Sequence, residues 1–145
     1  MSRTSCLLLA GLLVSATAAC GSFHHAARGR SLPVQRYGMV IGVKPEKIDE
    51  YRRLHAHPWP GVLTMIRECK IRNYSIYLAE LEPGKHYLFG YFEYVGDDFD
   101  ADMQKMAADA ETQRWWKETD PCQYPIATAK PGEKWSIMEE VFHTD

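Results

Sequence analysis

The sequence predicts an α+β fold in which an antiparallel four-stranded sheet carries helices on one face. Three observations support this prediction. Runs of strand length alternate with segments of helical periodicity in the order β-α-β-β-α-β. The two central runs are joined by residues 82–85, Glu-Pro-Gly-Lys, which suit a tight turn. At 145 residues, the chain has room for one domain.

The first predicted strand covers residues 34–43, which are mostly apolar and β-branched. Pro45 suits the first turn of a helix, because the N–H that proline lacks would be unpaired there anyway. We expect this helix to end near His57, since Pro58 disfavours helical geometry in the residue before it. A second short helix is expected to follow, with an apolar stripe made of Val62, Leu63, Ile66 and Cys69.

The second half of the predicted fold begins with a hairpin of residues 71–81 and 86–95, which are rich in β-branched and aromatic side chains. A helix is predicted over residues 97–111, because its start is acidic and one side is apolar. We expect Thr112 to cap a further turn and residues 134–143 to form the last strand. This order is that of the ferredoxin-like split βαβ arrangement.

Both faces of the predicted hairpin carry apolar or aromatic side chains. One set of alternating positions contains Tyr74, Ile76, Leu78, Phe92 and Tyr94, and the other contains Tyr77, Tyr87, Phe89 and Tyr91. A large uncovered apolar face marks an interaction site. We therefore expect a homodimer, a dimeric α/β barrel in which two sheets face each other. Helices on both faces are the alternative, but the sequence contains too few of them.

The overall charge and the motifs exclude several kinds of partner. A net charge of −2 provides no field that would attract nucleic acid or an anionic membrane surface. The sequence has no G-x-S-x-G element, no phosphate-binding glycine loop and no G-x-G-x-x-G fingerprint. We expect neither a nucleotide nor another cofactor.

Residues 1–19 are predicted to be a signal peptide, because an early arginine precedes a short apolar run and then small residues. Cleavage after Ala16-Thr17-Ala18 would fit an ordinary site, whereas the residues around Cys20 resemble a lipobox in which Cys20 is lipidated. Residues 20–33 predict a flexible tether to a domain over residues 34–145. We expect an exported protein, either periplasmic or anchored to the membrane through this lipid, with secretion as the alternative.

The remaining cysteines and histidines do not indicate a metal site. An exported protein could join Cys69 to Cys122, but we expect both to be free and half-buried. His55 and His57 are two residues apart on a helix and point to different sides, which is poor geometry for one metal ion. We predict no metal.

Tyr51 and His55 form the first candidate for chemistry. They are four residues apart, so they lie one turn apart on the same helical face. A tyrosine can orient a hydroxylated ligand, and a histidine can accept or donate a proton near neutral pH. A hydrogen-bonded histidine at the edge of the core is the alternative interpretation.

Aromatic side chains form the second candidate. Trp115 and Trp116 are neighbours that point about 100° apart on a helix, so one can anchor the helix while the other forms a pocket wall. Indole faces suit the C–H-rich faces of sugars, although packing alone also explains such a pair. Tyr74 lies at the start of the hairpin, where a ligand contact and an interstrand aromatic pair are both reasonable.

These motifs resemble the L-rhamnose mutarotases, a family of small bacterial proteins with a ferredoxin-like dimeric α/β barrel. The resemblance covers about residues 37–143 and includes Y-x-x-x-H-x-x-x-W-P, "NYSIYL", "LFGYFE", "QRWW" and "EEVFH". The leader and the segment of residues 118–133 depart from the family pattern.

The resemblance implies an isomerase that interconverts the α and β anomers of L-rhamnose or a related deoxyhexose. It implies that His55 is the proton donor and that Tyr51, Tyr74, Trp115 and Trp116 contact the sugar. Two alternatives are a non-catalytic sugar-binding lipoprotein and a cofactor-free monooxygenase of the same barrel superfamily.

Overall fold

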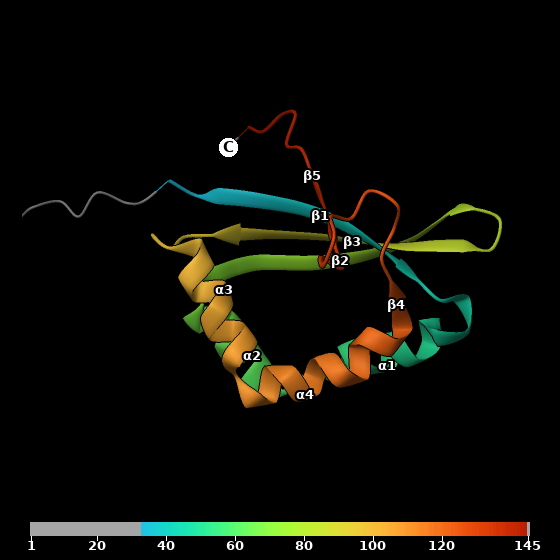
Figure 1. Ribbon diagram of the computed structural model, residues 1–145, viewed down its shortest axis with the longest axis horizontal. Coiled ribbons are helices and arrows are strands. Elements are labelled where there is room, and N and C mark those ends of the chain that lie inside the picture. Colours follow the sequence, from blue (N-terminus) through green and yellow to red (C-terminus); the bar gives the residue numbers. More distant parts are fainter. Residues whose placement is uncertain (1–32, 145) are drawn as a thin grey trace, which may run out of the picture. The chain divides into compact units, whose positions relative to one another are not determined.

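A computed structural model describes residues 33–144 of the protein (Figure 1). The predicted signal peptide, Cys20 and all of the predicted tether except Pro33 lie outside the described residues. No helix among the described residues is long and apolar enough to cross a membrane. The helices and strands are, in order, β1 (Gln35–Val43), η1 (Pro45–Lys47), α1 (Ile48–Ala56), α2 (Pro60–Glu68), β2 (Ile71–Glu82), β3 (Lys85–Tyr94), α3 (Phe99–Ala108), α4 (Ala110–Thr119), η2 (Asp120–Cys122), β4 (Gln123–Tyr124) and β5 (Ser136–Met138).

The sheet is antiparallel, with the strand order β2-β3-β1-β4 and with β5 also paired to β1. Helices α1 to α4 lie on one side of it (Figure 1). Along β3, the side facing the helices holds the buried positions Leu88, Gly90, Phe92 and Tyr94. The predicted ferredoxin-like fold, with helices on one face, is confirmed.

An irregularity in β2 decides which side chains face the helices. Arg72 pairs with Glu93 and Ser75 pairs with Tyr91, so two residues of β2 oppose one residue of β3. Asn73 is the extra residue, with φ of 50° in the left-handed region that asparagine tolerates. The bulge changes the alternation of side chains, so Tyr74 faces the helical layer and contacts Phe92 edge-to-face at 5.7 Å.

The predicted helix over residues 97–111 is interrupted. Asp109 has extended backbone geometry and separates α3 from α4. Its carboxylate accepts a hydrogen bond from the backbone N–H of Thr112 at 2.7 Å, which caps α4. The expectation that Thr112 is the cap was wrong, because Thr112 is a buried residue inside α4.

The last strand is shorter than the predicted residues 134–143. Two short strands share one edge of β1: β4 pairs with Gly42 and Val43, and β5 pairs with residues 38–40. Pairing ends at Met138, and Val141 and Phe142 are 88% and 78% exposed. Strand β4 was not predicted, because two residues carry no recognisable periodicity.

The first predicted helix also differs slightly at both ends. Pro45 begins a 3-10 turn, and α1 then runs from Ile48 to Ala56. Tyr51 and Leu54 are the buried residues of α1, which places His55 on the inner side of the same helix.

Candidate functional site

A cavity of about 760 Å³ is lined by residues of the sheet and of the helices. The five side chains predicted to act on a sugar all line it: Tyr51, His55, Tyr74, Trp115 and Trp116. They come from α1, β2 and α4, so the fold brings together residues that are far apart in the sequence. Their roles in a reaction stay predictions.

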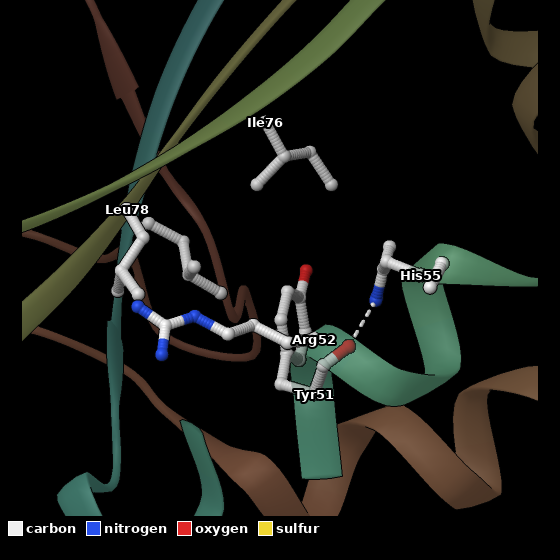
Figure 2. Close-up of a pocket in the computed structure, with 7 residues that line it drawn as sticks. Tyr51, Arg52, His55, Ile76 and Leu78 are labelled. Carbon is white, nitrogen blue, oxygen red and sulfur yellow. Dashed lines mark hydrogen bonds between the residues drawn. The ribbon is translucent and has the colours of Figure 1, made fainter. Parts of the chain in front are cut away.

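His55 is held from two sides. Its ring stacks on Tyr51, with ring centroids 4.0 Å apart, and meets the edge of Trp115 at 5.2 Å. Its Nδ1 atom lies 3.0 Å from the backbone carbonyl oxygen of Tyr51 (Figure 2). Because a carbonyl oxygen can only accept, Nδ1 carries the hydrogen and Nε2 of the neutral ring is left as the proton acceptor.

The surroundings of His55 favour the neutral ring. Burial lowers the pKa of His55, and the hydrogen bond with the carbonyl of Tyr51 opposes this shift without cancelling it. Near neutral pH, the imidazole is therefore a base with its lone pair on Nε2.

Tyr51 and Tyr74 are phenols that keep their protons. Burial, followed by the nearby Tyr74, raises the pKa of Tyr51, whose hydroxyl accepts a hydrogen bond from Gln123 at 3.4 Å. Burial also raises the pKa of Tyr74 to about 12. Tyr74 is nevertheless 39% exposed, and it lines the cavity. Both hydroxyls can therefore donate hydrogen bonds to a ligand.

The two neighbouring tryptophans both line the cavity but differ in exposure. Trp115 is 6% exposed, packs with Leu54 and Val62, and meets the edge of Trp59 at 5.5 Å. Trp116 is 37% exposed and lines the cavity. Trp115 thus anchors α4 and supports His55, whereas Trp116 offers an indole face.

Some of the cavity residues that were not predicted belong to the segment that departs from the family pattern or directly follow it. They include Asp120, Gln123, Lys134 and Trp135. Lys134 forms an ion pair with Asp120. Trp135 lies over Gly90, where an added Cβ would come within 3.4 Å of the indole and 2.7 Å of Met39. The small residue in β3 was the sequence signal for this close approach.

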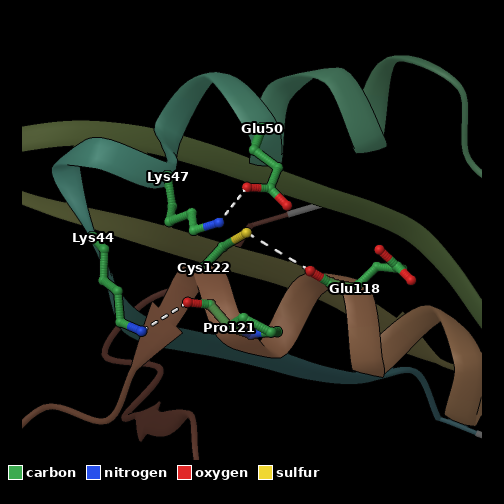
Figure 3. A network of polar contacts seen from close by, with 6 residues as sticks. All are labelled: Lys44, Lys47, Glu50, Glu118, Pro121 and Cys122. Carbon is green, nitrogen blue, oxygen red and sulfur yellow. Dashed lines mark hydrogen bonds and ion pairs between the residues drawn. The ribbon is translucent and has the colours of Figure 1, made fainter.

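Polar contacts hold η2 in place (Figure 3). The backbone N–H of Lys44 donates to the carbonyl of Cys122 at 2.9 Å, and its ammonium group donates to the carbonyl of Pro121 at 2.8 Å. The Cys122 thiol lies 3.7 Å from the carbonyl of Glu118. These contacts tie η2 to the end of β1 and so position Gln123 against Tyr51.

Cys69 and Cys122 are free, as expected. Both are buried, so the expectation that they are half-buried was wrong. Among the described residues, no group of three His, Cys, Asp or Glu side chains is arranged to hold a metal ion.

A second, smaller cavity of about 330 Å³ adjoins His55 (Figure 2). It shares Tyr51, His55 and Ile76 with the larger cavity, and Arg52 from α1 also lines it. His55 and Tyr51 therefore line two neighbouring cavities.

Comparisons with known proteins show the family of this chain. A model of the L-rhamnose mutarotase family matches residues 36–144. The L-rhamnose mutarotase of Oceanobacillus iheyensis is 31% identical over 112 residues, covering 77% of this chain and 100% of that protein. The L-rhamnose mutarotase of Bacillus subtilis is 30% identical with the same coverage.

A solved structure shows the same fold. The crystal structure of an L-rhamnose mutarotase from Formosa agariphila matches with a TM-score of 0.56 and 18% sequence identity. The match covers 77% of this chain and 99% of that chain. At this identity, the similarity supports the fold alone.

Proposed function

Because the chain belongs to the L-rhamnose mutarotase family, we propose that it interconverts the α and β anomers of L-rhamnose or a related deoxyhexose, with His55 moving the protons. Membership of this family confirms the resemblance and makes the protein an isomerase of the racemase and epimerase class. It favours neither non-catalytic sugar binding nor a monooxygenase.

The observation that carries the proposal is the state of His55. A neutral imidazole, with Nδ1–H held by a carbonyl and Nε2 available, lines a cavity walled by tyrosines and tryptophans. Anomer exchange needs one group that accepts a proton from one sugar oxygen and returns it to another. His55 meets this requirement.

The proposed reaction balances within the sugar and the imidazole. Nε2 accepts the proton of the anomeric hydroxyl while the bond from C1 to the ring oxygen breaks, and C1 becomes an aldehyde. The imidazolium then gives this proton to the ring oxygen, which is the donor role implied for His55. The aldehyde group then rotates about the bond from C1 to C2. The reverse steps close the ring on the other face of the aldehyde and give the other anomer.

The remaining predicted residues would hold the sugar. The phenols of Tyr51 and Tyr74 stay protonated and can donate hydrogen bonds to sugar oxygens. Trp116 can pack against the C–H-rich face of the ring, while Trp115 keeps the imidazole in place.

The direct test is anomer exchange measured by magnetisation-transfer NMR with the purified protein. A panel of L-rhamnose, L-fucose and common hexoses would be compared with buffer alone. Exchange above the background, fastest with a deoxyhexose, is expected. Tight binding without exchange would instead support a sugar-binding protein, and oxygen uptake with aromatic substrates would support a monooxygenase.

We also propose that two copies associate through the outer face of the sheet, which carries no helix among the described residues. Tyr77 is 63% exposed and Leu81 is 62% exposed on β2, and Phe89 of β3 lies directly opposite Tyr77. Light scattering should give the mass of a dimer, and Tyr77→Glu should shift it towards the monomer. A monomeric wild-type protein would contradict this proposal.

The proposal of export concerns residues outside the described part of the chain. We propose that residues 1–19 are removed and that Cys20 is lipidated in the mature protein. Mass spectrometry of the mature N-terminus would test this, because cleavage after Ala18 without lipid, or an uncleaved chain, gives a different mass.

A further inference from the structure

The larger cavity extends well beyond His55. Helices α1 and α3 lie at opposite ends of the helical layer (Figure 1). The cavity is lined from both, by His55 of α1 and by Met103 and Met106 of α3. Its volume of about 760 Å³ lies in the upper part of the range of about 300–1,000 Å³ found for cavities that bind drug-sized ligands. A single hexose beside His55 would leave the α3 end unfilled.

The two ends of this cavity differ in chemistry. The α1 end contains hydrogen-bonding groups, including Tyr51, His55 and Gln123. The other end, called here the apolar end, is formed by Met39, Ile66, Ile71, Phe92, Met103 and Met106. These six side chains come from β1, β2, β3, α2 and α3, and none of them has an N–H or O–H group.

The apolar end cannot serve a second sugar well. Transfer of a hydroxyl from water to a site without a hydrogen-bond partner costs free energy, and these six side chains provide no partner. Transfer of a hydrocarbon group from water into the same space is favourable. The unbranched, flexible side chains of Met103 and Met106 can adapt to such groups.

Resting on the proposed anomer exchange, we propose that the preferred substrate is a reducing deoxyhexose that carries an alkyl or acyl substituent on a hydroxyl other than the anomeric one. The anomeric hydroxyl must stay free, because its proton is the one that His55 accepts. The sugar ring then occupies the α1 end and the substituent occupies the apolar end. The single methyl group of an unsubstituted 6-deoxyhexose fills little of that end.

The test compares L-rhamnose with its 2-O-, 3-O- and 4-O-methyl, ethyl and propyl ethers. Dissociation constants come from calorimetry and exchange rates from magnetisation-transfer NMR. For one position of substitution, each added methylene should lower Kd and KM about fourfold, or about 15-fold from methyl to propyl. The 2-hydroxyethyl ether at that position, matched in length to propyl, should lose this gain.

A matched pair of variants locates the substituent. Met106→Gln keeps the length of the side chain but adds an amide, whereas Met106→Leu keeps it apolar. Met106→Gln should reduce the gain in affinity from the methyl to the propyl ether to threefold or less. Met106→Leu should preserve most of this gain. The gain is measured within each variant, as the ratio of the dissociation constants of the methyl and propyl ethers, so that a general change in sugar binding does not affect the comparison.

The outcomes separate this inference from the proposed function. If L-rhamnose exchanges but no ether binds more tightly than L-rhamnose, the inference is overturned and the proposed function stands. The same result would follow if a segment of the protein's own chain filled the apolar end. If the propyl ether binds most tightly but no sugar exchanges, the apolar end is supported and the proposed function fails.

Discussion

The two faces of the sheet are both rich in aromatic side chains, yet they differ in what surrounds them. On the inner face, Phe92 and Tyr94 are buried beneath the helices, and Tyr74 lines the cavity. On the outer face, Tyr77 projects away from the helices and is largely exposed. Aromatic content therefore does not identify a site by itself. The helices and the bulge in β2 determine which aromatic side chains line the cavity.

The largest effect is expected from His55, which lies in the cavity beneath the inner face and is held by Tyr51 and Trp115. His55→Ala should lower anomer exchange by about 10²- to 10⁴-fold, because a positioned acid or base contributes this much. His57→Ala is the matched control, since His57 is an exposed residue just past the end of α1. Equal rates for the two variants in magnetisation-transfer NMR would contradict the assignment.

The next prediction concerns the free energy of unfolding and compares one tyrosine from each face of the sheet. The hydroxyl of Tyr94 donates to Asp102 at 2.7 Å and accepts from the backbone N–H of Asp98 at 3.1 Å, which joins β3 to the start of α3. Tyr94→Phe leaves both partners unpaired and should lower the free energy of unfolding by about 1–3 kcal/mol. Tyr77→Phe on the outer face should change it by about 0.5 kcal/mol or less.

Urea unfolding at one protein concentration would measure both variants. If Tyr94→Phe lowered the free energy of unfolding no more than Tyr77→Phe, the contacts of Tyr94 with α3 would not contribute to stability as described.

A smaller effect is expected at the bulge that directs Tyr74 inward. Asn73 has φ of 50°, a conformation that costs an ordinary residue about 1–2 kcal/mol. Asn73→Ala should lower the free energy of unfolding by roughly that amount, whereas Asn73→Gly should lower it less, because glycine accepts this conformation and both variants lose the hydrogen bond of Asn73 with Glu93. A stable alanine variant with unchanged exchange would show that the bulge does not position Tyr74.

The sequence was sufficient for the parts of the fold that have a clear period. The strands and helices around Tyr51, His55 and Trp115 follow alternations of 2 and 3.6 residues, so their faces could be predicted. The break between α3 and α4 was expected at Thr112 and lies at Asp109, because the capping carboxylate of Asp109 determines its place.

The cavity wall beyond α4 could not be predicted in the same way. Asp120, Gln123 and Trp135 lie in or next to a stretch with short elements and no periodicity. Their places depend on contacts with distant residues, such as the bonds from Lys44 to η2 and the packing of Trp135 over Gly90. Sequence spacing contains no information on such contacts.

The pH dependence of catalysis shows whether the neutral imidazole of His55 is the catalytic base. Burial lowers the pKa of His55, so the active neutral imidazole should persist below the ordinary value of about 6.5. NMR of the imidazole would give the pKa of His55, and kcat/KM for anomer exchange would be measured over the same range. We expect kcat/KM to fall as the pH drops, with a midpoint at the pKa of His55 in the free protein. A constant kcat/KM while His55 becomes protonated would contradict it.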